Sequence, residues 1–168
     1  MGDTLRRLAA KCLHSRVLES VSTYVTPLQV GVQVPNAAEL VARKVTHWAR
    51  APPPGTATLQ IDVKNAFNSL SRGALLSAVK SHLRALYHYA LKCYDHPTAL
   101  FGEGFCLESS RGVQQGDVCG PALFALTIHD VVLKLDASWT SSAWTTSSGT
   151  SLTACSAARP RCSVKPSN

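Results

Sequence analysis

The spacing of hydrophobic residues predicts helices over much of the first 136 positions. Residues 5–24 carry apolar side chains loosely on one helical face, at Leu5, Leu8, Cys12, Val17 and Val21. A second helix is expected to begin at Asn36, which is a good N-cap residue. Residues 72–94, capped by Ser71, have the most regular pattern, and a last helix is expected over 121–135. The positions of 72–94 expected to face a core are Leu75, Val79, Leu83, Leu86, Ala90 and Tyr94.

Two other segments have the features of β-structure. Residues 58–63 alternate between polar and apolar side chains, which predicts a strand with Leu59, Ile61 and Val63 on one side. Residues 101–110 contain two glycines and are predicted to form a β-hairpin. Because helices and strands follow one another along one chain, the fold class is expected to be α+β.

The composition changes after Asp136. Residues 137–168 contain nine Ser and five Thr, no Asp or Glu, and neither helical nor alternating spacing. Such a segment has too little apolar surface to fold by itself. We therefore expect one domain over residues 1–136 and a disordered C-terminal tail over 137–168.

Charge and cysteine content narrow the class of protein. The 168 residues include 17 Lys and Arg against 10 Asp and Glu, a net charge of +7, and 45% are hydrophobic. No apolar run approaches the ~18–20 residues of a membrane span, and the early charges leave no room for a signal peptide. The six cysteines form no C-x-x-C pair, so reduced thiols are expected. We expect an intracellular protein with no membrane segment and no disulfide partner; its positive charge weakly favours an anionic partner.

Two segments carry residues suited to chemistry. In Ile61-Asp62-Val63-Lys64-Asn65-Ala66-Phe67-Asn68, an acidic residue stands near the end of an apolar strand, where burial is costly unless the group is paired or bound to a metal. Alternatively, Asp62 is partly exposed and simply begins a turn. In residues 110–121, three glycines allow close approach of the backbone, and a Gln amide can both donate and accept. Alternatively, residues 110–121 form an ordinary polar loop that leads into a helix.

Taken together, the two segments resemble the reverse transcriptase palm of non-LTR (LINE-type) retrotransposons. Asp62 followed by Ala66-Phe67 is similar to the first catalytic motif of that family. Arg111-Gly112-Val113-Gln114-Gln115-Gly116-Asp117, with the helix after it, is similar to the second, a Gly-Val-x-Gln-Gly-Asp loop. The resemblance covers residues 5–135 and implies a partial polymerase palm with the end of the fingers.

The resemblance also implies a reaction. These enzymes are RNA-directed DNA polymerases that join deoxynucleotides to a DNA primer on an RNA template by two-metal phosphoryl transfer. Asp62 would bridge two Mg²⁺ ions, and the carbonyl of Val63 would supply a further oxygen. Localisation is then nuclear by family, although no basic cluster here forms a convincing import sequence.

Further roles follow from the resemblance. Phe67 would pack under the incoming sugar and exclude a ribose 2′-hydroxyl, while Gln115 and Gly116 would line the nucleotide pocket. Arg111 and Lys64 could contact nucleic-acid phosphates. A solvated loop arginine is the favoured interpretation of Arg111, and Lys64 could likewise be only a solvated charge.

One part that the family requires is missing from the sequence. The aromatic-x-Asp-Asp motif, expected on a β-hairpin after the last helix, has no counterpart, since no Asp or Glu follows Asp136. If the codons from Trp144 onward are read one base earlier, one triplet encodes Asp and the next can also encode Asp. A shift of the reading frame would therefore explain the tail. A native disordered tail stays the alternative. The chain is therefore predicted to be an inactive reverse transcriptase fragment. The competing hypotheses are a non-catalytic nucleic-acid-binding module and a small helical interaction domain.

Overall fold

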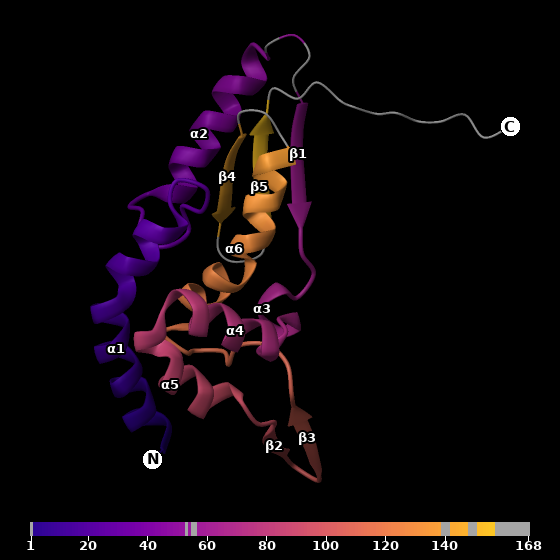
Figure 1. Ribbon diagram of the computed structural model, residues 1–168. Helices are drawn as coiled ribbons and strands as arrows, with labels where there is room; N and C mark the ends of the chain where they lie inside the picture. The colour runs from indigo at the N-terminus through magenta and orange to yellow at the C-terminus, as the bar shows by residue number, and fades with distance from the viewer. Residues whose placement is uncertain (1, 53, 55–56, 139–141, 148–150, 157–168) are drawn as a thin grey trace, which may run out of the picture.

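The computed structural model describes residues 2–52, 54, 57–138, 142–147 and 151–156. Helices and strands follow one another along the chain, which confirms the α+β class (Figure 1). In chain order the elements are α1 (Gly2–Val25), α2 (Ala37–Arg50), β1 (Ala57–Asp62), α3 (Ala66–Ser69), α4 (Arg72–His82), α5 (Arg84–Tyr94), β2 (Thr98–Gly102), β3 (Phe105–Ser109), α6 (Gly120–Ser138), β4 (Ser142–Ser147) and β5 (Ser151–Ser156).

Helices α1, α4, α5 and α6 surround the main hydrophobic core. The apolar stripe predicted over 72–94 is confirmed, because all six of its residues are buried. The predicted single helix is two helices, which meet at Leu83 with φ −146° and ψ 65°. Leu83 remains buried at this break, and its N–H donates to the carbonyl of Val79. Ser71 caps α4 as predicted, accepting a hydrogen bond from the N–H of Ala74.

The predicted inner face of the first helix is partly wrong. Leu5 and Leu8 are 72% and 59% exposed, whereas Val17, Val21 and Val25 are buried. Tertiary packing is the reason, because α1 contacts α5 and α6, and the positions of those helices determine which of its apolar residues are buried. At α2, Asn36 is the N-cap residue as predicted, and its carbonyl accepts a hydrogen bond from the N–H of Leu40 at 3.0 Å. Its backbone is left-handed (φ 55°), and its side chain makes no cap hydrogen bond.

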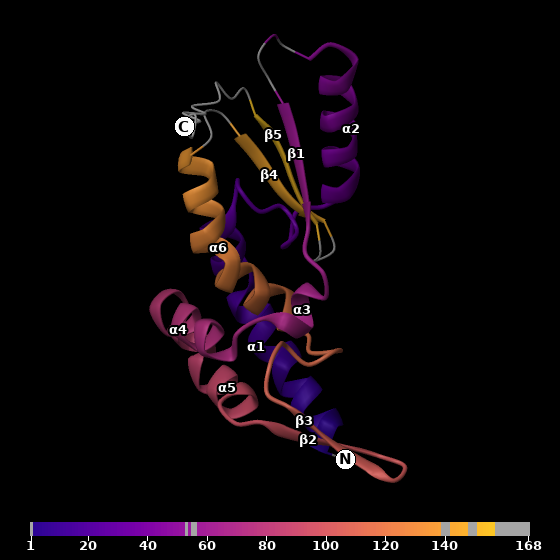
Figure 2. The ribbon, with the colours of Figure 1, turned by 90° about the vertical axis from the view of Figure 1, so that its right-hand side faces the viewer.

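A three-stranded antiparallel sheet lies between α2 and α6 (Figure 2). Its strand order is β1-β5-β4, so two segments of the expected tail form strands, and the prediction of disorder is wrong for 142–147 and 151–156. Alone, β1 would present unpaired backbone N–H and C=O groups, and pairing with β5 satisfies one of its edges. Thr, frequent in these strands, is also compatible with β-structure. Residues 157–168 lie outside the described residues.

The strands β2 and β3 form the hairpin predicted at 101–110. They pair antiparallel from Thr98 with Ser109 to Gly102 with Phe105. The hairpin extends from the helical body at the end opposite the sheet (Figures 1 and 2). In the described part of the chain, no helix combines the length and apolar character that crossing a bilayer requires. Four cysteines there, Cys12, Cys93, Cys106 and Cys119, are free thiols.

Candidate functional site

The two motif segments meet in space, although about 40 residues separate them. The N–H of Gly112 donates to the carbonyl of Leu70 at 2.8 Å, and the N–H of Val113 donates to that of Phe67 at 3.0 Å. Gly112 has φ +72°, and a Cβ there would lie 2.5 Å from Cα of Asn68. Only glycine combines this backbone conformation with so close an approach. The glycine therefore joins the loop 112–117 to α3.

A cavity of about 330 Å³ opens between α3 and this loop. Phe67, Gln115 and Gly116, the three residues expected to bind substrate, all line it. The half-buried Phe67 ring is held by Phe124 of α6, with 4.7 Å between ring centroids. Gly116 has φ +84°, and a Cβ there would have no atom within 4 Å, so its backbone faces open space.

The residues expected to hold metal lie outside the lining of this cavity. Asp62 is the last residue of β1, and its side chain is exposed. Val63 is 41% exposed, and Lys64 is exposed before the chain turns through Asn65 (φ 58°) into α3. Within the described residues, no three or more His, Cys, Asp or Glu side chains form a group that could hold a metal ion. Asp62 supplies one carboxylate, which alone does not fit a two-Mg²⁺ centre.

Arg111 lies beside a second, wider hollow of about 820 Å³. This groove runs between the β2–β3 hairpin and the loop, and it shares Gln114 and Gln115 with the first cavity. The Arg111 side chain is exposed, while its carbonyl accepts a hydrogen bond from buried Arg72 at 3.3 Å. Arg6 also lines the groove. Arg111 is thus available to an anionic ligand, whereas Lys64 belongs to neither cavity.

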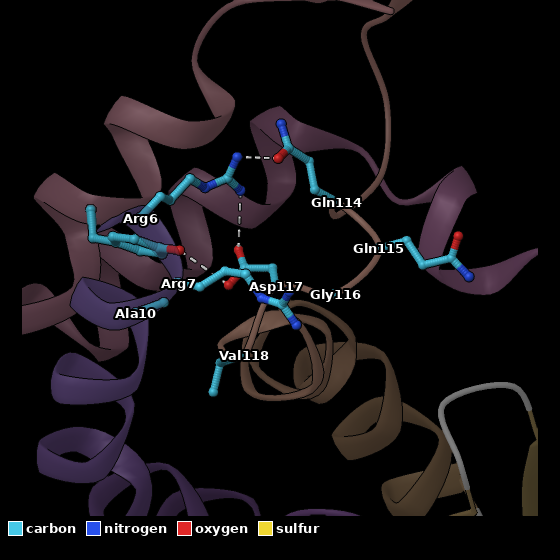
Figure 3. Close-up of a pocket in the computed structure, with 9 residues that line it drawn as sticks. Arg6, Arg7, Ala10, Gln114, Gln115, Gly116, Asp117 and Val118 are labelled. Atoms are coloured by element: carbon cyan, nitrogen blue, oxygen red, sulfur yellow. Dashed lines mark hydrogen bonds and ion pairs between the residues drawn. The ribbon is translucent and has the colours of Figure 1, made fainter. Parts of the chain in front are cut away.

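A buried polar network behind the loop is what sequence reasoning missed. The Asp117 side chain is fully buried and accepts hydrogen bonds from Tyr89 at 3.1 Å, from Tyr94, and from the N–H of Cys119 at 2.9 Å. Arg6 of α1 lies 3.7 Å from the carboxylate (Nη2 to Oδ2). Figure 3 shows its guanidinium between Asp117 and Gln114, while Gln115 points away from this network. Asp117 belonged to the quoted motif without a role, and Tyr94 was expected only to face the core.

Electrostatics keep the donors of this network protonated. Burial, together with the Asp117 carboxylate, raises the pKa of Tyr89 and of Tyr94 far above their ordinary value. Burial also raises the pKa of the Cys119 thiol to about 12, with Asp117 contributing. Both tyrosines are therefore neutral O–H donors to a carboxylate at all physiological pH values.

No family model, no curated protein and no solved structure matches this chain. Function is therefore inferred from the site itself and from the resemblance of its two motif segments. The cavity between α3 and the loop offers an aromatic face, an exposed amide and an open stretch of backbone. Its volume lies within the range of sites that hold small ligands, roughly 300–1,000 Å³. The lining therefore combines an apolar surface with hydrogen-bonding groups.

Proposed function

We propose that this chain derives from an RNA-directed DNA polymerase of the non-LTR retrotransposon type, and that it retains the deoxynucleotide pocket without the polymerising activity. The main support is the cavity in which Phe67, Gln115 and Gly116 come together. Phe67 belongs to the first motif and Gln115 and Gly116 to the second, and these motifs lie far apart along the chain.

The chemistry of the pocket fits a deoxynucleotide. The Phe67 ring would lie under the sugar, where its volume opposes a 2′-hydroxyl. The Gln115 amide can donate and accept hydrogen bonds, and the backbone at Gly116 is open to a phosphate or sugar oxygen. Phe124 holds the aromatic ring in place, so its volume is a fixed feature of the pocket.

The sheet indicates where the missing carboxylates would lie. The resemblance calls for a β-hairpin after the last helix, and β4 and β5 follow α6 as an antiparallel pair. Asp62 pairs with Ser151, and Ser151 pairs with Ser147, so these positions lie in one row across the three strands. The Asp-Asp pair expected from the shifted frame, around 144–146, would fall in β4 beside that row. This chain has no carboxylate there, which is why we propose that it does not polymerise.

Nucleotide binding tests the retained pocket. We would titrate the full chain with dGTP and with GTP by isothermal titration calorimetry, with and without MgCl₂. Tighter binding of dGTP is expected, and Phe67→Ala should raise the affinity for GTP relative to dGTP because it removes the ring that opposes the 2′-hydroxyl. Phe101→Ala, on the exposed hairpin, is the matched control. Equal, weak binding of both nucleotides that Phe67→Ala leaves unchanged would overturn the proposal.

Polymerisation and its loss need separate tests. Primer extension on an RNA template with MgCl₂ is expected to give no sustained synthesis; sustained synthesis would disprove inactivity. The nucleotide sequence from codon 130 onward should read Asp-Asp in the shifted frame and continue as polymerase-like sequence. If the reading frame is intact and the shifted frame encodes nothing similar to a polymerase, the C-terminal segment would be native.

The groove beside Arg111 supports a second candidate, a non-catalytic nucleic-acid-binding module. Arg6 and Arg111 line it together with the hydroxyl residues Thr98, Ser109 and Ser110. Binding to single-stranded RNA should weaken steeply with salt, and Arg111→Gln should lower the salt slope by about one. Lys64→Gln, outside the groove, is the comparison variant. Absence of retention on heparin and RNA at low salt would exclude this candidate.

A further inference from the structure

The loop that carries Gln115 and Gly116 has open space on both of its sides. In front lies the cavity of about 330 Å³, and behind lies a smaller one of about 90 Å³ lined by Arg6, Arg7, Tyr89 and residues 114–118. A segment between two hollows is not held in place by close packing. Its position must therefore depend on hydrogen bonds.

Those hydrogen bonds come from α1 and α5. The N–H of Gln114 donates to the hydroxyl of Tyr94 at 3.3 Å, and Arg6 donates to the side-chain carbonyl of Gln114. Tyr94 then donates to Asp117, at the other end of the same short segment. One tyrosine hydroxyl thus holds both ends of the stretch that contains Gln115 and Gly116.

Asp117 gives this arrangement its strength. A fully buried carboxylate is costly unless donors surround it, and here two phenols, one backbone N–H and one guanidinium do so. Removing one donor leaves the charge short of partners, and the remaining groups must move to compensate. The loop is the part with room to move, because cavities border it.

We propose that Arg6, Tyr94 and Asp117 are positioning residues that hold Gln115 and Gly116 against Phe67, and so set the affinity and the deoxyribose selectivity of the pocket. This inference rests on the proposed function. None of the three residues needs to touch the nucleotide. It also makes the N-terminal helix α1 part of the binding site, since Arg6 reaches the loop from its beginning.

Conservative variants separate positioning from folding. Tyr94→Phe keeps the buried ring and removes only the hydroxyl, and Arg6→Gln keeps a donor but removes the charge. We expect each to weaken dGTP binding about tenfold, and to reduce the preference for dGTP over GTP, at temperatures where circular dichroism shows a folded chain. Arg6→Lys should restore part of the affinity because it returns a positive charge beside Asp117. Tyr87→Phe, on the same helix and outside both cavities, should change neither quantity.

The outcomes are distinguishable. The positioning role would be overturned if the wild-type chain binds dGTP and the folded Tyr94→Phe and Arg6→Gln variants bind it with equal affinity. A wild-type chain that binds no nucleotide would instead overturn the proposed function. If Tyr94→Phe fails to fold, Arg6→Gln decides the matter, because Arg6 stands at the partly exposed edge of the network (28% exposed).

Discussion

Replacement of Arg72 by Met should be among the most destabilising changes that this chain can undergo. Arg72 is only 7% exposed, and its guanidinium makes five hydrogen bonds. The acceptors are the carbonyls of His96, Ser109, Arg111 and Gly112 and the Ser109 hydroxyl. Since these acceptors belong to the turn after α5, to β3 and to residues 111 and 112, one side chain joins three parts of the structure.

The magnitude follows from the kind of bond that is lost. Hydrogen bonds to a charged group contribute about 1.5–3 kcal/mol each, but they do not add when they share one donor group. Arg72→Met leaves several acceptors without a donor, at about 1–3 kcal/mol for each one that stays buried, and we expect a loss of about 3 kcal/mol in the free energy of unfolding. Met keeps the aliphatic volume, so the loss reports the guanidinium. Arg72→Lys should recover only part of it, because an ammonium cannot reach the same fork of acceptors.

Urea denaturation followed by far-UV circular dichroism measures this quantity. Arg84→Met is the matched control, since Arg84 begins α5 as Arg72 begins α4 but is exposed. The control should change the free energy of unfolding by less than about 0.5 kcal/mol. A loss below about 1 kcal/mol for Arg72→Met, with an unchanged m-value, would refute the role of Arg72 as the link between hairpin, loop and α5.

Two further predictions concern the loop and a buried histidine. Gly112→Ala should cost at least about 2 kcal/mol of stability, because its Cβ would meet the backbone of α3, whereas Gly116→Ala should cost only about 1 kcal/mol. The urea midpoints of the two variants compare these losses directly. Equal losses would contradict the close approach at Gly112. Burial lowers the pKa of His129, and Gln29 donates to its Nδ1 at 2.9 Å, so the folded state holds it neutral. Stability that is complete above the unfolded pKa of about 6.5 should fall as pH drops below it, by up to about 1.4 kcal/mol per pH unit, and His129→Gln should flatten that slope.

Helices could be predicted from the sequence where neighbouring residues carry the signal. The stripe from Leu75 to Tyr94 has the spacing of a helix face, and the Ser71 cap precedes it directly, so both are written in neighbouring residues. The break at Leu83 was not predictable, because no Gly or Pro marks it and both flanking helices keep their apolar positions. The inner face of α1 was missed for a related reason: which of its apolar residues is buried depends on where α5 and α6 lie.

Three residues that line the 330 Å³ cavity could be picked out from the sequence, whereas the residues that support the loop could not. Phe67, Gln115 and Gly116 belong to motifs whose spacing can be recognised along the chain. Arg6 and Arg72 donate across more than 35 residues to loop atoms, and nothing in their own neighbourhoods distinguishes them from solvated arginines. The strands β4 and β5 were missed because their Ser- and Thr-rich sequence has no apolar alternation. Their pairing comes from the edge that β1 offers.

The pocket and the strands β4 and β5 belong to different parts of the chain, and this separation can be tested. Every residue that lines the 330 Å³ cavity or belongs to the Asp117 network lies between Arg6 and Pro121. A chain that ends at Ser138 should therefore bind dGTP within about twofold of the full chain, while the exposed edge of β1 lowers its solubility. Calorimetry on the truncated chain, with its helical circular dichroism as the control for folding, measures this. Loss of binding with an intact helical spectrum would show that β4 and β5 belong to the nucleotide site. Retained binding would explain how a shifted reading frame could remove catalysis and leave a nucleotide-binding fold behind.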